Sequence, residues 1–247
     1  MIECFPPKKD ILEILNYSGN KLTDFTMQVK NINYESGNVS FYELVIINTL
    51  VKIFRPQRVL EIGSFNGRTA RNIAANLCSN NYYGSKPHVY TVDLPPENKK
   101  GDTVITQLQI EDGTVFKDVC ERGFMGRKDK AFQNTFEEAY ITQIWSDSAL
   151  LCKESFPQID PLDFWFDFIF IDGSHSYEYF KSDTNFAVNH SAHGGIILWH
   201  DYGCGDGNGW PGVVKGMHEY YNSLEGDQFI YHIEGTSMVI QLLDYNI

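Results

Sequence analysis

The chain has 247 residues, of which 43% are hydrophobic, and its 20 basic and 32 acidic residues give a formal net charge of -12. This length and apolar content suit one packed α/β domain and argue against a disordered chain. The acidic surplus argues against a nucleic-acid-binding protein, because no excess of basic side chains is available to neutralise phosphates.

The five cysteines are scattered and form no C-x-x-C pair, which argues against a disulfide framework or a zinc cluster. The amino terminus, MIECFPPKKD, lacks the apolar core of a signal peptide. No apolar run is long enough to span a membrane. We therefore expect a cytoplasmic protein that is not attached to a membrane.

The N-terminal residues 1–38 are polar and mixed, and predict an extension with one short helix at ILEILNY. Residues 39–247 predict the main domain, which opens with a helix from Ser40 to Phe54. Ser40 and Glu43 fit a capping box at its start, and the apolar residues that follow repeat on one helical face.

Buried strands and helices then alternate along the chain. Strands are predicted at RVLEIG, HVYTVDLP, ITQIWSDSA, FDFIFIDG and GGIILWHD. Helices are predicted at TARNIAANL, SYEYFKSDTNFAVNH and GVVKGMHEYYNSL, and an antiparallel pair at FIYHIEG and SMVIQLL. The fold class is therefore α/β, with a doubly wound, Rossmann-like and mostly parallel sheet and an antiparallel C-terminal edge hairpin.

The alternation weakens at about residues 97–140, which is longer than a strand–helix–strand step requires. We expect a cap or lid insertion here. Its basic stretch GFMGRKDK is either a lid over a ligand or a solvated surface loop.

Polar and glycine residues gather where the predicted parallel strands end, at GSFNG, Asp93, SDS, IDGSH and HDYG. Ligands of such sheets bind beyond the carboxyl ends of the strands. In the first of these turns Phe65 stands where the dinucleotide fingerprint requires a glycine, so the turn does not fit a pyrophosphate.

In this order, the segments resemble class I S-adenosylmethionine-dependent methyltransferases. The E-x-G-x-x-x-G-x-T pattern in EIGSFNGRT carries the resemblance, together with VYTVDLPPE, IDGSHSYEYFKSD, GGIILWHDYG and IEGTS. Within that superfamily they resemble the branch of macrocin-type sugar and small-molecule O-methyltransferases. The likeness covers roughly Ser40 to Leu243 and is thin in the insertion.

The resemblance implies an S-adenosylmethionine site. Asp93 stands where the family binds the ribose hydroxyls, Thr69 and the backbone near Gly63 where it binds the methionine carboxylate, and Asp147 where it reads the adenine. Asp93 as a loop cap and Asp147 as a helix cap remain open alternatives. The implied cofactor residues are Glu61, Gly63, Ser64, Gly67, Thr69, Asp93, Leu94, Asp147, Ser148 and Asp172.

The resemblance also implies a divalent metal, magnesium or manganese, on Asp172, His200 and Asp201. Where close relatives carry a second carboxylate or an Asp-Asn pair, this chain has His200 before Asp201. That donor set suits iron or zinc as well. His200 either binds the metal or supports the residues that do, and Asp172 could instead be a turn residue in Asp-Gly.

His175, three residues after Asp172, resembles the family's general base, and an imidazole can titrate near neutral pH. The resemblance thus assigns His175 and Asp172 to catalysis. His175 as a helix-start residue bonded to backbone stays open. Trp210, in CGDGNGWPG, either walls the acceptor pocket or belongs to a glycine-rich connection.

We therefore expect an S-adenosylmethionine-dependent O-methyltransferase that acts on a hydroxyl of a small molecule such as a sugar or natural product. Two alternatives stay open: a nicotinamide-dependent oxidoreductase on a similar sheet, and a non-catalytic subunit that keeps the cofactor fold. The sequence fixes neither the acceptor nor the oligomeric state, and residues 1–38 could pack against a second copy.

Overall fold

A computed structural model describes most of the chain, and places the insertion only in part. The described residues are 5–17, 26–30, 34–78, 86–96, 127–203, 209–225 and 229–243, with the backbone of two strands at 104–109 and 115–120. Of the predicted lid stretch GFMGRKDK only residues 127–130 are described, and residues 204–208 of the CGDGNGWPG loop also lie outside the described ranges.

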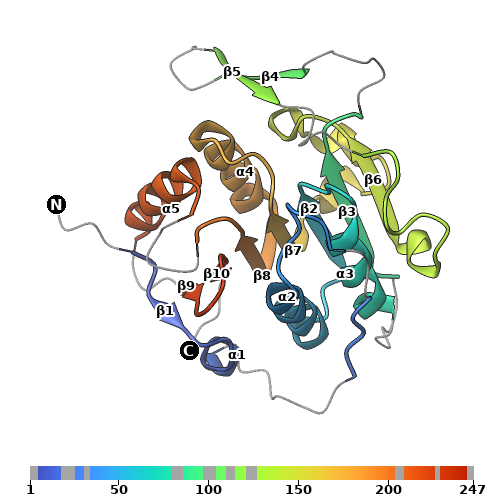
Figure 1. The fold of residues 1–247 in the computed structure, drawn as a ribbon, viewed down its shortest axis with the longest axis horizontal. Coiled ribbons are helices and arrows are strands. Elements are labelled where there is room, and N and C mark those ends of the chain that lie inside the picture. The colour runs from blue at the N-terminus through green and yellow to red at the C-terminus, as the bar shows by residue number, and fades with distance from the viewer. Residues whose placement is uncertain are drawn as a thin grey trace.

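The main sheet has eight strands in the order β1-β9-β10-β8-β7-β2-β3-β6 (Figure 1). Their bounds are β1 (Lys8–Lys9), β2 (Arg58–Ile62), β3 (His88–Asp93), β6 (Ile141–Trp145), β7 (Phe166–Ile171), β8 (Ser191–Trp199), β9 (Phe229–Ile233) and β10 (Val239–Leu242). Neighbours from β8 to β6 run parallel, whereas β10 is antiparallel to both β8 and β9. This confirms the predicted mostly parallel sheet with its antiparallel C-terminal hairpin.

Five α-helices occur in the described residues: α1 (Ile11–Tyr17), α2 (Phe41–Phe54), α3 (Arg68–Cys78), α4 (Tyr177–His190) and α5 (Pro211–Ser223). Helices α2 and α3 cover one face of the sheet, and α4 and α5 cover the other (Figure 1). Successive strand residues point to opposite faces: Val59 packs with α2 and α3, whereas Leu60 packs with α4 and α5. A strand buried on both faces therefore reads as a continuous apolar run.

The N-terminal extension packs on its own domain. Side chains of α3 bind its backbone, with Asn76 Oδ1 accepting from the Gln28 N–H at 2.9 Å and Asn72 Oδ1 from the Lys30 N–H at 2.8 Å. Strand β1 pairs parallel with β9, so the predicted hairpin is not the outermost part of the sheet.

The predicted insertion contains a separate two-stranded antiparallel sheet, β4 (Val104–Gln109) with β5 (Val115–Cys120), followed by the 3₁₀ helix η2 (Phe136–Tyr140). Three further 3₁₀ helices precede β7: η3 (Ser148–Leu150), η4 (Lys153–Ser155) and η5 (Pro161–Asp163). Over the described part of the chain, no helix has the length and apolar character that a membrane crossing requires.

Candidate functional site

The carboxyl ends of the parallel strands meet along one edge of the sheet. The backbone hydrogen bonds continue one residue beyond the strands: Asp172 N–H donates to Ile62 O at 2.8 Å and Gly63 N–H to Val92 O at 2.9 Å. His200 N–H likewise donates to Ile171 O at 3.0 Å. The structure thus brings together the turns that the sequence singled out, as the parallel order predicts.

The glycine turn needs both of its glycines for packing. Gly63 has φ 97°, and a Cβ there would lie 1.8 Å from the carbonyl oxygen of Asp172. Gly67 has φ 75°, and a Cβ there would lie 2.8 Å from the ring of Phe132. Only glycine adopts such a backbone freely and leaves room for these neighbours.

Two predicted cofactor residues in this region are engaged inside the protein. Glu61 is buried under the turn and accepts a hydrogen bond from the Thr91 hydroxyl, and burial raises its pKa to about 8. Ser64 donates to Gln143 Oε1 at 3.1 Å. Thr69 is buried in the first turn of α3, at a helix start where backbone N–H groups favour an anion.

Asp93 ends β3, and its carboxylate already accepts from neighbouring donors. Leu94 N–H donates to Oδ1 at 2.9 Å, and the ammonium of Lys130 lies 2.9 Å from Oδ2. Lys130 comes from the predicted insertion, and its side chain is only 1% exposed. Sequence reasoning noted the basic stretch that contains Lys130, but nothing in its spacing pointed to Asp93.

Asp147 caps η3, as its alternative interpretation proposed. Its Oδ1 accepts from Ala149 N–H at 3.0 Å, and its Oδ2 accepts from the Tyr179 hydroxyl at 2.9 Å. Ser148 begins that 3₁₀ helix. The role of both residues in adenine binding stays a prediction.

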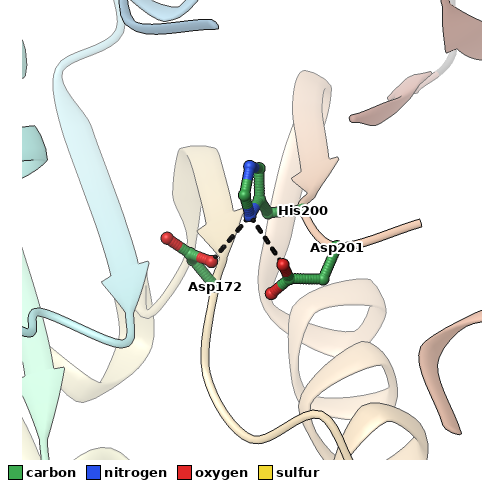
Figure 2. Close-up of side chains that lie close together, drawn as sticks. All are labelled: Asp172, His200 and Asp201. Carbon is green, nitrogen blue, oxygen red and sulfur yellow. Dashed lines mark ion pairs between the residues drawn. The ribbon is translucent and has the colours of Figure 1, made fainter. Parts of the chain in front are cut away.

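On the other side of the glycine turn, Asp172, His200 and Asp201 form a tight cluster (Figure 2). His200 Nδ1 lies 3.0 Å from Asp172 Oδ1 and 3.2 Å from Asp201 Oδ1. Figure 2 shows this nitrogen facing both carboxylates, whereas the other ring nitrogen points away from them. Asp201 has φ 66°, a left-handed backbone that is unusual for a residue other than glycine.

The second nitrogen of His200 faces a carboxylate that sequence reasoning treated only as a helix cap. His200 Nε2 lies 3.3 Å from Glu43 Oε2. Glu43 also accepts from Ser40 N–H at 2.8 Å, as the capping box predicts, and from Ser237 N–H at 2.7 Å. It therefore connects the start of α2 with the β9–β10 turn and the end of β8.

The three carboxylates set the charge of His200. Burial alone would lower the pKa of its imidazole, but Asp172, Asp201 and Glu43 together raise it well above its usual value. Burial raises the pKa of Asp172, an effect that His200 opposes. Burial also raises the pKa of Glu43. Contacts with His200 and two backbone N–H groups outweigh this effect and lower the pKa to about 2.

His175 lies at the same cluster. Its Nε2 is 2.9 Å from Asp201 Oδ2, and its ring stacks on Trp210 with centroids 4.5 Å apart and an interplanar angle of 13°. Trp210 is half exposed, so the two rings form a partly open wall beside the acidic groups. A small pocket adjoins them, lined by Ile171, Asp172, Gly173, Ser174, His175, Phe180, Trp199, His200, Asp201 and Val213.

The donor set of this cluster fits a divalent cation. One ligand atom from each of Asp172, His200 and Asp201 lies within 4.8 Å of the others. Both ring nitrogens of His200 are buried, and neither makes a well-aligned hydrogen bond within the described residues. Two carboxylates and an imidazole suit magnesium, manganese, iron or zinc.

Residues 60–202 match a family model described as a methyltransferase domain. No curated protein sequence matches the chain.

Solved structures share its fold. An O-methyltransferase from Streptomyces achromogenes involved in tomaymycin synthesis, TomG, in complex with SAM, has a TM-score of 0.54 at 14% identity and covers 86% of this chain and 92% of its own. The O-methyltransferase from Bacillus cereus in complex with SAH has a TM-score of 0.52 at 16% identity, with coverages of 95% and 91%. The SAH-bound Podospora anserina methyltransferase PaMTH1 has a TM-score of 0.52 at 12% identity, with coverages of 95% and 88%.

Proposed function

The chain belongs to the methyltransferase-domain family that its residues 60–202 match, and from this membership we propose that it methylates a hydroxyl of a small molecule with S-adenosylmethionine as the donor. The observation that carries the proposal is the single sheet edge on which the glycine turn and Asp93 lie beside the cluster of Asp172, His200 and Asp201. Two structural neighbours that contain SAM or SAH are O-methyltransferases. Family membership removes the oxidoreductase alternative.

The cofactor side of this edge has the groups that an adenosyl amino acid needs. Bound there, S-adenosylmethionine supplies a methyl group on a sulfonium sulfur. Asp93 accepts from the ribose hydroxyls, and the first turn of α3 with Thr69 binds the carboxylate. Asp147 and Ser148 follow the end of β6, the strand next to β3, and Asp147 contacts Tyr179 of α4. They line the adenine end.

The other side positions the acceptor. Asp172, His200 and Asp201 would hold a divalent cation, which would supply Lewis acidity toward an acceptor oxygen. His175 takes the proton of the acceptor hydroxyl on its imidazole, and Asp201 at 2.9 Å stabilises the imidazolium that forms. Trp210, stacked on His175, fixes the ring plane and covers one side of the acceptor.

Calorimetric titration with S-adenosylhomocysteine tests the cofactor half of this proposal. Methyl transfer to a panel of sugars and hydroxylated natural products, with magnesium, with manganese and with EDTA, tests the other half. Binding of S-adenosylhomocysteine together with metal-dependent transfer supports the whole proposal. Binding without transfer to any hydroxyl favours the non-catalytic alternative, and transfer that EDTA leaves unchanged removes the metal from it.

A further inference from the structure

Lys130 is a buried cation at the cofactor end of the sheet edge, and the mechanism above does not use it. Its Nζ lies 2.9 Å from Asp93 Oδ2 and 2.5 Å from the carbonyl oxygen of Phe65. The indole ring of Trp145 lies beside it, with its centroid 4.9 Å from the ammonium nitrogen. A carboxylate, a carbonyl dipole and an aromatic ring thus surround one ammonium group.

The backbone around Lys130 is fixed to the glycine turn. We call residues 127–133 the strap. Ala131 N–H donates to Asn66 O at 2.7 Å, and Arg71 Nη1 donates to Ala131 O at 3.2 Å. Phe132 lies against Gly67, where a Cβ would come within 2.8 Å of its ring. The strap therefore aims the Lys130 side chain at Asp93.

A gain in folding stability does not by itself explain why Asp93 and Lys130 are buried as an ion pair. Burial raises the pKa of Asp93 and lowers that of Lys130, and each group opposes the other's shift. Desolvation of a buried ion pair commonly cancels its attraction, so such pairs add little net stability. Lys130 also lowers the pKa of the neighbouring Glu61, which Asp93 raises.

The geometry leaves Asp93 able to accept further hydrogen bonds. Leu94 N–H uses one position on Oδ1, and Lys130 uses one on Oδ2. The Phe65 N–H also interacts with this carboxylate. Since each carboxylate oxygen has two lone pairs, the group keeps acceptor capacity beyond its contacts with these three donors. Two adjacent hydroxyls of a ribose match this capacity, provided that the carboxyl group is ionised.

We propose that Lys130 belongs to the cofactor site as the fixed counter-ion of Asp93, which holds both carboxylate oxygens as acceptors for two adjacent ribose hydroxyls. This inference rests on the proposed function, in which Asp93 binds the ribose. Lys130 acts through Asp93 and is a positioning residue. Through Lys130, the predicted insertion then contributes one residue to the cofactor site.

Calorimetric titration of the full chain with S-adenosylhomocysteine tests the proposal. Lys130→Met should weaken binding roughly tenfold or more, as expected when a charge-assisted acceptor is lost. Arg127→Met is the matched control, because Arg127 lies on the same strap but pairs with Glu35 and covers the ring of Phe65. It should change the affinity by about twofold or less, as exposed substitutions do.

A second ligand separates this role from a general loss of structure. The 2′-deoxy analogue of S-adenosylhomocysteine lacks one of the two hydroxyls, so the wild-type chain should prefer the parent compound and Lys130→Met should lose most of that preference. Lys130→Arg keeps the charge and should bind close to wild type, whereas Lys130→Gln should behave like Lys130→Met. If Lys130→Met does not fold, the comparison of Lys130→Arg with Lys130→Gln tests the proposal in its place.

Equal or tighter binding of S-adenosylhomocysteine by Lys130→Met and Lys130→Gln would overturn the inference, since Lys130 would then be irrelevant or an obstacle. Equal weakening of both ligands would also overturn it, because the ribose would not be involved. A wild-type chain that does not bind S-adenosylhomocysteine would instead contradict the proposed function itself.

Discussion

At the scale of single residues, His175 is the side chain that the proposed mechanism assigns to proton transfer. Its ring stacks on Trp210, and its Nε2 lies 2.9 Å from Asp201 Oδ2. His175→Ala should lower kcat about 10²- to 10⁴-fold, the usual contribution of a general base, and leave the affinity for S-adenosylhomocysteine unchanged. His193→Ala, at an exposed position on β8, is the control. An equal loss of turnover and cofactor affinity would contradict the catalytic role.

The ionisation of Asp183 should make the stability of the fold depend on pH. It lies on α4 and is 1% exposed, and burial raises its pKa to about 7. Its folded pKa exceeds its unfolded value near 3.8, so its contribution to stability is fully present below about pH 4 and is lost as pH rises through about 7. The free energy of unfolding of Asp183→Asn should therefore exceed that of the wild type by about 1–3 kcal/mol at pH 8. The two should be equal near pH 4.

Denaturant titrations at several pH values measure this difference. Glu178→Gln on the same helix is the control, because Glu178 is not buried. A wild-type chain whose stability rises between pH 5 and pH 8 relative to Asp183→Asn would contradict the assignment.

At the scale of elements, Glu43 of helix α2 makes two kinds of contact. Its carboxylate completes the capping box with Ser40 and also faces His200 Nε2 at 3.3 Å. Residues that orient a metal-binding histidine typically contribute 10- to 100-fold to metal affinity. Glu43→Gln should therefore weaken manganese binding roughly tenfold or more, measured by calorimetry with S-adenosylhomocysteine present.

Ser40→Ala distinguishes orientation of His200 from helix stability. It removes the hydroxyl cap, which costs about 1 kcal/mol, without touching the imidazole. Manganese affinity should stay at the wild-type value in this variant. A similar loss in both variants would mean that α2 acts on the metal only through its own stability.

Helix α2 also illustrates what local sequence could predict. Its start followed from Ser40 and Glu43, because a capping box is satisfied within four residues. Glu43 and His200 are 157 residues apart in the sequence, so no local pattern predicts their contact. Lys130 is similar: its basic stretch was visible, but only the docking of the strap on Asn66 and Gly67 brings it to Asp93.

At the scale of the whole molecule, the first strand protects an edge. The predicted N-terminal extension pairs through Lys8 and Lys9 with β9, and the Pro7 carbonyl accepts from His232 N–H at 3.0 Å. Removing residues 1–10 would leave the backbone groups of β9 open to another chain. We expect the truncated chain to self-associate at concentrations where the full chain does not, as measured by light scattering. Unchanged oligomeric state would contradict this role for β1.

The architecture as a whole could be predicted from the alternation of strands and helices, since strands covered on both faces are mostly apolar. The glycine turn, Asp93, Asp172 and Asp201 could be predicted as site candidates because each lies at the carboxyl end of such a strand. Strand β1 was not predicted, because two lysines show no strand pattern. They form a strand only by pairing with the edge of β9.

The close contact of Gly63 with the Asp172 carbonyl has a thermodynamic consequence. The proposed cofactor residues and the proposed cation cluster meet at this backbone contact, where a Cβ at Gly63 would lie 1.8 Å from that oxygen. We expect a shift of one to displace the other. Occupancy of one site should therefore alter affinity at the other. By linkage, manganese must change the dissociation constant of S-adenosylhomocysteine by the same factor by which S-adenosylhomocysteine changes that of manganese. Titrations around the four sides of this cycle would measure the heterotropic coupling, and a factor of one would show that the two sites are independent.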